Sequence, residues 1–74
     1  MSKQDFLQNA KAFIDSEIYG AQQCEDKLTE DEWRRWIKAE EADQIAQGVE
    51  HELFTDQELD WIIEELSNAG VVAE

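Results

Sequence analysis

Proline is absent from this chain of 74 residues, and glycine occurs only three times, at Gly20, Gly48 and Gly70. The chain also lacks runs in which β-branched and polar residues alternate strictly. Proline and glycine are the commonest interruptions of helices, and strict alternation is typical of a half-buried strand. The sequence therefore predicts an all-α fold, and its length predicts a single domain over residues 1–74 with a small core.

Signals for membrane targeting and for disulfide bonds are lacking too. The first residues contain no apolar signal segment, and no apolar run approaches the roughly 18–20 residues that a membrane span requires. The single cysteine, Cys24, has no partner for an internal disulfide, and we expect it to be a small buried apolar residue. These features predict a cytoplasmic protein that makes no membrane contact.

Positive charge ends halfway along the chain. No lysine or arginine follows Lys38, whereas the 36 residues after it contain eleven carboxylates, and the formal net charge is −13. Such a field repels nucleic acid and anionic membranes and attracts basic protein surfaces. We therefore expect no direct binding of nucleic acid, and a partner protein with a basic surface.

The first helix is predicted over residues 3–25. Ser2 is a suitable N-cap, and Asp5 at the third helical position gives a weak capping box. Gly20 either ends this helix or lies inside it, and we prefer the longer version because Cys24 would then share the apolar face. Apolar residues recur at intervals of three and four, which indicates one buried face; they are Phe6, Leu7, Ala10, Phe13, Ile14, Ile18 and Ala21.

The second and third helices, predicted over residues 30–46 and 56–68, share one start signal. In both, a threonine is followed three positions later by a glutamate, which is the spacing of a capping box. An apolar residue before the threonine can also pack on the apolar residue at the fourth helical position. The similarity is explained either by an ancient duplication or by independent convergence on the same capping residues. The capping pairs are Thr29 with Glu32 and Thr55 with Glu58, and the apolar pairs are Leu28 with Trp33 and Phe54 with Leu59.

The third helix has the more regular apolar stripe. Gly70 can end it in the left-handed conformation, with Val71 folding back onto Leu66. The stripe consists of Leu59, Ile62, Ile63 and Leu66.

The second helix is less regular. Trp33, Trp36 and Ile37 form one stripe, but Glu40 and Gln44 occupy the positions that would continue it. This helix therefore either leaves the core after Ile37 or presents its second half to a partner. Taken together, the patterns predict a small three-helix domain.

Acids are dense on the third helix. Five of them occur in the twelve residues from Thr55 to Leu66, which is one charge per roughly 3.6 Å of helix axis. A DNA strand presents one phosphate per about 3.4 Å. No lysine or arginine lies at helical spacing to offset these acids. This half of the chain therefore suggests nucleic-acid mimicry, and the alternative is an acidic coat that serves only solubility.

Trp61 is a candidate contact within this acidic region. It follows Leu59 by two residues, so at about 100° per residue it points about 200° away from the apolar stripe. It would stack on an arginine or fill a pocket of a partner; alternatively it packs on the first helix or on a second subunit. The predicted partner-binding set is Glu40, Glu41, Asp43, Glu50, Glu52, Asp56, Glu58, Asp60, Trp61, Glu64 and Glu65.

Other kinds of site find little support. Arg34, Arg35 and Lys38 form a small basic patch, which we expect to bond to neighbouring acids such as Glu30. His51 has no second histidine or cysteine pair beside it, so we expect no metal site. No nucleophile–base arrangement, phosphate-binding glycine loop or cofactor fingerprint occurs, so we expect no enzyme activity and no cofactor.

These features predict a non-enzymatic acidic binding protein, an inhibitor or modulator that engages the basic surface of a nucleic-acid-binding protein. In composition the chain resembles the short acidic proteins with which phages and mobile elements block host nucleic-acid-binding enzymes. That resemblance covers bulk properties without a diagnostic motif, and it implies a viral anti-defence protein. The alternative is a structural or adaptor module, a homodimer joined through the second helix and Trp61, with the acids serving only solubility.

Overall fold

The computed structural model describes residues 2–48 and 53–73 of the chain. The elements in these two stretches are helices and one pair of two-residue strands, so the predicted all-α class is confirmed. None of the helices in these two stretches is both long and apolar enough to cross a lipid bilayer. In chain order the elements are α1 (Lys3–Asn9), α2 (Lys11–Gln22), β1 (Leu28–Thr29), α3 (Glu30–Ala46), α4 (Asp56–Asn68) and β2 (Val72–Ala73).

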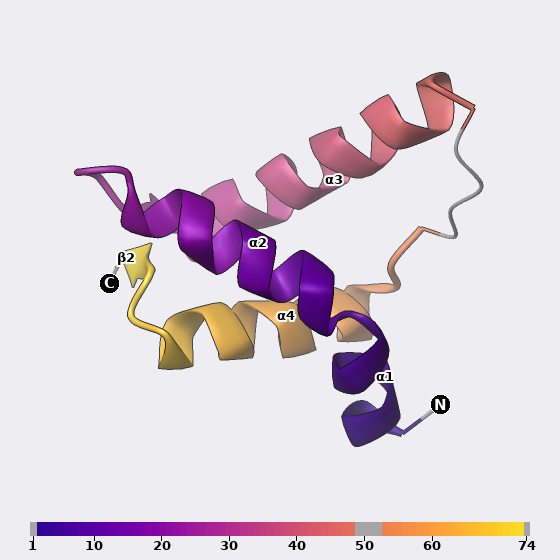
Figure 1. Ribbon diagram of the computed structural model, residues 1–74, viewed down its shortest axis with the longest axis horizontal. Helices are drawn as coiled ribbons and strands as arrows, with labels where there is room; N and C mark the ends of the chain where they lie inside the picture. The colour runs from indigo at the N-terminus through magenta and orange to yellow at the C-terminus, as the bar shows by residue number, and fades with distance from the viewer. Residues whose placement is uncertain (1, 49–52, 74) are drawn as a thin grey trace.

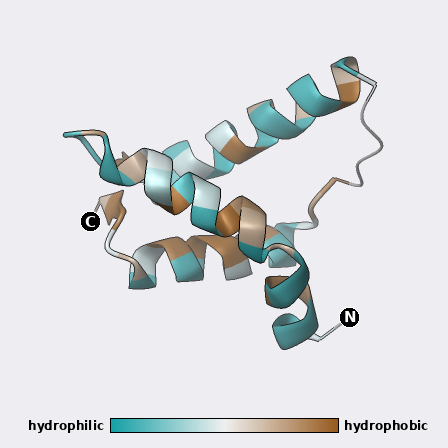
Figure 2. Ribbon diagram, viewed as in Figure 1, coloured by the Kyte–Doolittle hydropathy of each residue, from teal (hydrophilic) through white to brown (hydrophobic). Residues whose placement is uncertain are grey.

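The central element is α4, which lies along the lower part of the molecule in Figure 1. The helices α1, α2 and α3 and the strand β2 all pack against it. Figure 2 shows hydrophobic residues gathered along α4, whereas α3 is mainly hydrophilic. The buried apolar core comprises Leu59, Ile62, Ile63 and Leu66 of α4 together with Phe6, Ala10, Ile14, Trp33, Ile37 and Val71.

The predicted helix starts are confirmed. The hydroxyl of Ser2 accepts a hydrogen bond from the backbone N–H of Asp5 at 3.2 Å. At Thr29 and Thr55 both halves of the capping box are present, with donor–acceptor distances between 2.9 and 3.3 Å. These bonds satisfy N–H groups that the first helical turn leaves without partners. The second and third predicted helices consequently have the bounds that the sequence indicated.

The first predicted helix differs from the structure at two points. It is divided at Ala10 into α1 and α2, and α2 ends at Gln22, short of the predicted end. No proline or glycine marks the division. The bend brings the ring of Phe6 to 5.8 Å from Phe54 and 5.7 Å from Trp61. Aromatic packing of this kind is a tertiary effect that outweighs local helix propensity.

The helix α4 ends in the turn that Gly70 predicted. This residue has φ +76°, and its N–H donates to the carbonyl of Ser67 at 3.0 Å. The N–H of Val71 donates to the carbonyl of Leu66 at 3.2 Å, which completes a Schellman motif. Val71 is thereby turned into the core, and its own carbonyl accepts a hydrogen bond from the indole N–H of Trp33 at 3.0 Å.

Beyond this turn the chain runs beside the start of α3. Strands β1 and β2 pair in parallel, Leu28 with Val72 and Thr29 with Ala73. This pairing could not be predicted from the sequence, because two residues are too few to show the periodicity of a strand. The pairing ties the segment after α4 to the segment before α3.

The buried line of α3 runs through Trp33, Ile37 and Glu41. Trp36 does not belong to it, contrary to the predicted stripe, because half of its surface (50%) is exposed. Glu41 is only 2% exposed, and its Oε2 accepts a hydrogen bond from the N–H of Phe54 at 2.8 Å. Contact between α3 and the rest of the fold therefore continues one turn beyond Ile37, to Glu41, and the residues of α3 after Glu41 are exposed or half-buried.

Gly20→Ala and Gly70→Ala are expected to change stability in opposite directions. Both glycines have open space where a Cβ would lie. Gly20 lies inside α2, so alanine should stabilise the fold by roughly 0.5–1 kcal/mol. Gly70 has φ +76°, so alanine there should cost about 1–2 kcal/mol. Urea unfolding of both variants measures the difference, and shifts of the same sign would contradict the assignment of Gly20 to a helix interior and of Gly70 to a left-handed turn.

Candidate functional site

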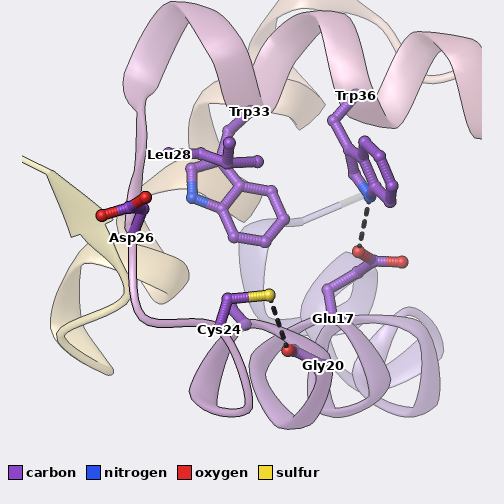
Figure 3. Close-up of a pocket in the computed structure, with 8 residues that line it drawn as sticks. Glu17, Gly20, Cys24, Asp26, Leu28, Trp33 and Trp36 are labelled. Carbon is purple, nitrogen blue, oxygen red and sulfur yellow. Dashed lines mark hydrogen bonds between the residues drawn. The ribbon is translucent and has the colours of Figure 1, made fainter.

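A groove lies where α2 and α3 separate. Both helices pack on α4, but within the described residues no Cα atom of α2 comes within 8 Å of one in α3. The space between them forms a cavity of about 270 Å³ that is partly open to solvent (Figure 3). We call this cavity the α2–α3 groove; its lining residues are Glu17, Gly20, Ala21, Cys24, Asp26, Leu28, Trp33 and Trp36.

The helix α3 supplies the aromatic wall of the groove. Trp33 and Trp36 both project from this helix toward α2 in Figure 3. The single polar atom of the Trp33 ring already bonds to the carbonyl of Val71. Trp36 donates its indole N–H to Oε2 of Glu17 at 3.1 Å, a bond that crosses from α3 to α2. The exposed Trp36 ring is therefore held in one position by a hydrogen bond, which makes it a pre-positioned surface for a ligand.

The opposite wall consists of small side chains near the end of α2. Gly20 and Ala21 leave room in front of the tryptophans. Cys24 is exposed, not buried as the sequence analysis predicted, because α2 ends at Gln22 and Cys24 lies beyond the helical face. Its thiol donates to the carbonyl of Gly20 at 3.6 Å.

The groove has an acidic rim. Glu17 and Asp26 lie in its lining, and among the described residues of that lining none is a lysine or arginine. Glu40 follows Trp36 by one turn of α3. Burial, then the hydrogen bond and the charge of Glu17, raise the pKa of Glu40 to about 7, with a smaller contribution from Asp43 and an opposing one from Trp36. Near neutral pH this region therefore carries crowded carboxyl groups without a compensating cation.

The acids of α4 are partly compensated by cations from the first half of the chain. Nζ of Lys3 lies 2.8 Å from Oε2 of Glu64. Arg34 contacts Asp60 of α4 and also Glu30, the latter at 3.3 Å. Exposed pairs of this kind typically add only about 0–1 kcal/mol to stability. They nevertheless reduce the net negative charge on the surface of α4. The sequence did not reveal these pairs, because their partners lie far apart in the chain.

Other members of the predicted partner-binding set lie in different environments. Glu41 is buried and hydrogen-bonded, so it does not belong to an exposed binding surface. Glu50 and Glu52 lie outside the described residues. Four further members are partly or fully exposed, namely Asp43, Asp56, Glu58 and Glu65. The described members of the predicted set are thus divided among the surface of α3, the surface of α4 and the interior, and none of them lines the α2–α3 groove.

Trp61, the predicted anchor, is half-buried. Its ring lies 5.7 Å from Phe6 of α1, and it packs at the edge of the core. This is the alternative in which Trp61 packs on the first helix. A contact of Trp61 with a partner stays a prediction, and the tryptophan with the largest exposure in the described part of the chain is Trp36.

Trp36 was missed as a site residue because the sequence analysis assigned it to the core. Trp33, Ile37 and Glu41 recur every four residues, and a line through them leaves Trp36 on the flank of α3. That line is visible in the sequence only if a carboxylate is accepted as a core residue. Buried glutamates are rare unless they are paired, so the apolar residues alone indicated a stripe that contains Trp36 and leaves out Glu41.

Within residues 2–48 and 53–73, no three histidine, cysteine, aspartate or glutamate side chains are arranged to hold a metal ion. His51 lies outside these residues.

Comparisons with protein families, with curated proteins and with solved structures gave no significant match. A function for this protein is therefore argued from its surface and from the α2–α3 groove.

Glu40→Gln should stabilise the protein in a pH-dependent way. The pKa of Glu40 is raised in the folded state from its ordinary 4.5 to about 7, so ionisation of Glu40 opposes folding. The gain from glutamine should be absent below about pH 4.5, grow up to about pH 7 and stay constant above it. Solvent screening limits the gain to about 1 kcal/mol. Thermal unfolding from pH 4 to 8 measures it, and an equal gain at every pH would contradict the assignment.

Proposed function

We propose that this protein is a non-enzymatic acidic binding protein that inhibits or modulates a nucleic-acid-binding protein by occupying its basic surface. The observation that carries the proposal is a set of exposed carboxylates without an internal cation. Within the described residues, the exposed acids that neither form a salt bridge nor complete a capping box are Asp5, Glu25, Asp26, Asp31, Asp43 and Asp56.

Half of the six lysine and arginine side chains are paired with carboxylates of the protein itself. Lys3, Lys11 and Arg34 each form a salt bridge with a carboxylate. The net charge of −13 is carried by a domain with a radius of gyration of only 12.1 Å. A field of this density accelerates association with basic surfaces and disfavours contact with nucleic acid. It therefore supports competition with nucleic acid for the same basic surface.

The proposal rests on the acidic surface as a whole. The row of acids on α4, whose spacing is similar to that of phosphates along a DNA strand, supports nucleic-acid mimicry less than the sequence suggested. Two of these acids, Asp60 and Glu64, form salt bridges within the protein. The uncompensated acids lie instead on several elements, with Glu25 and Asp26 between α2 and β1 and Asp43 near the end of α3.

A pull-down from a lysate of the source cells tests the proposal. The immobilised protein should retain a nucleic-acid-binding protein at low salt. Salt above the physiological level should weaken binding about tenfold or more, because exposed charges are screened. Added DNA or RNA should displace the retained protein. Retention that is unaffected by salt and by nucleic acid would contradict the proposal.

Charge variants sharpen this experiment. Combined Asp31→Asn, Asp43→Asn and Asp56→Asn removes three uncompensated exposed acids and should lower the salt concentration at which the partner elutes. Arg35→Gln is the control, because it removes an exposed cation and should leave retention unchanged or increased. Equal weakening by both variants would indicate general damage to the surface and would count against an acidic contact.

A second candidate function is a structural or adaptor module that forms a homodimer. It is favoured by large apolar side chains on the surface, since Tyr19, Trp36, Ile45 and Leu53 are between 47% and 68% exposed. Exposed groups of this size often mark protein interfaces. The charge of each copy opposes such a dimer, because two domains of −13 would meet.

Sedimentation velocity over a wide range of protein concentration distinguishes the two functions. The inhibitor function predicts a monomer at every concentration, at low and at high salt. The adaptor function predicts a dimer that high salt strengthens, since salt screens the repulsion between the copies. A dimer that forms in the wild type and dissociates in the Trp36→Ala variant would favour the adaptor function over the inhibitor function.

A further inference from the structure

We infer that the α2–α3 groove is the docking site for a basic segment of a partner protein, with an arginine side chain lying on the Trp36 ring and its guanidinium beside the adjacent carboxyl groups of Glu17 and Glu40. The inference deepens the proposed function, and rests on it only in requiring that the partner surface be basic. It assigns the contact to one place in a fold whose acids are otherwise dispersed.

The size and lining of the groove suit one long side chain. Its volume of about 270 Å³ lies just below the range of about 300–1,000 Å³ that is typical of pockets for small organic ligands. The inner surface is mostly apolar, with Trp33, Leu28 and Ala21. An arginine has an apolar stem and a charged end, so its stem can cover these residues while its guanidinium stays at the rim.

The charge of the rim selects a cation. Glu17 and Asp26 lie in the lining, where the described residues include no lysine or arginine. Asp60 and Glu64 of α4 have Arg34 and Lys3 as partners. Glu17 of the lining instead has the carboxyl group of Glu40, beside the groove, within hydrogen-bonding reach, and neither forms a salt bridge with a described lysine or arginine. The raised pKa of Glu40 is the expected result of burial beside another carboxyl group. A guanidinium placed there would supply the missing positive charge.

Trp36 and the carboxyl pair together favour arginine over lysine. The exposed indole face of Trp36 is held by its hydrogen bond to Glu17, and a planar guanidinium stacks well on an aromatic face. Glu17 can accept further hydrogen bonds while bonded to Trp36, because a carboxylate has several acceptor positions. A guanidinium has five N–H donors in a fixed fork and can bond to two carboxyl groups at once.

A second copy of this chain is a poorer occupant. Each copy carries a net charge of −13, and the groove rim is acidic, so a self-complementary contact would bring like charges together. The basic patch of Arg35 and Lys38 could partly offset this repulsion, so the test below includes self-association as an outcome.

A peptide titration followed by NMR tests the inference. The probe is a short synthetic peptide with two adjacent arginines flanked by leucines, added to the ¹⁵N-labelled full chain. The indole N–H signal of Trp36 should shift on binding, and that of Trp61 should not. A peptide in which citrulline replaces arginine keeps the shape and loses the charge. It should bind about tenfold more weakly or worse.

Variants of the groove should lose affinity for the arginine peptide. Trp36→Ala, Glu17→Gln and Glu40→Gln should each weaken binding about tenfold. Glu40→Gln is the most informative of the three, because it is expected to make the fold more stable while it weakens binding. Loss of binding in that variant cannot result from unfolding.

Ile45→Ala is the matched control. Ile45 lies on the same helix as Trp36 and is similarly exposed, at 47% against 50%. It lies nine residues further along α3, which at about 100° per residue places it on the opposite side of the helix. Peptide affinity should be unchanged in Ile45→Ala, and an equal loss in this variant and in Trp36→Ala would overturn the inference.

Three further outcomes would also overturn it. Equal affinity for the arginine and citrulline peptides would show an apolar contact without charge recognition. Equal shifts at Trp36 and Trp61 would show binding outside the groove. Shifts of the Trp36 signal that depend on protein concentration in the absence of peptide would show that a second copy occupies the groove.

The inference and the proposed function can fail separately. If the pull-down recovers a nucleic-acid-binding protein equally well with wild type and with Trp36→Ala, the proposed function stands and the groove is not the contact. If the peptide binds in the groove but no nucleic-acid-binding protein is retained, the groove is confirmed and the proposed function is wrong.

Discussion

The apolar stripe of α4 is the contact on which the rest of the structure depends. Every other helix and the strand β2 pack against α4, and four of the buried core residues belong to that one helix. In a domain this small there is room for only one such core. Because α2 and α3 each pack on α4, they need not pack on one another, and the α2–α3 groove is the space that this arrangement leaves between them.

The helix α3 holds α4 at both ends. Trp33 donates a hydrogen bond to the carbonyl of Val71, just after α4, and Glu41 accepts one from the N–H of Phe54, just before it. Both bonds satisfy backbone groups that would be costly to bury without partners. A helix with few apolar residues thus contributes to the core through two polar side chains. The side of α3 that carries Trp36 is not part of this contact, and half of the Trp36 surface is exposed.

Charge opposes stability at one place in this protein, beside the residue to which we assign the proposed contact. Lys3 and Arg34 reach acids of α4 from other helices and offset part of the repulsion there. Glu17 and Glu40 receive no such help, and burial together with the proximity of Glu17 raises the pKa of Glu40. A folded protein that retains an unfavourable carboxyl pair beside an exposed tryptophan resembles many binding sites, where local stability is sacrificed for recognition.

Much of the fold could be predicted from local signals in the sequence. The two capping boxes at Thr29 and Thr55 gave the starts of α3 and α4, and Gly70 gave the turn after α4, because these features involve residues only a few positions apart. The division of the first helix at Ala10 could not be predicted in this way. It depends on packing of Phe6 against Phe54 and Trp61, far away in the chain.

By itself the sequence determined the helical class, the apolar stripe of α4 and the excess of negative charge, since composition and periodicity are properties of the chain alone. Only the tertiary structure decided that Glu41 is buried and Trp36 exposed, and that cations from the first half of the chain reach Asp60 and Glu64. The candidate groove belongs to this second group. Its walls come from two helices whose relative position is set by packing on a third and by the bond between Trp36 and Glu17. No spacing within either helix could therefore reveal it.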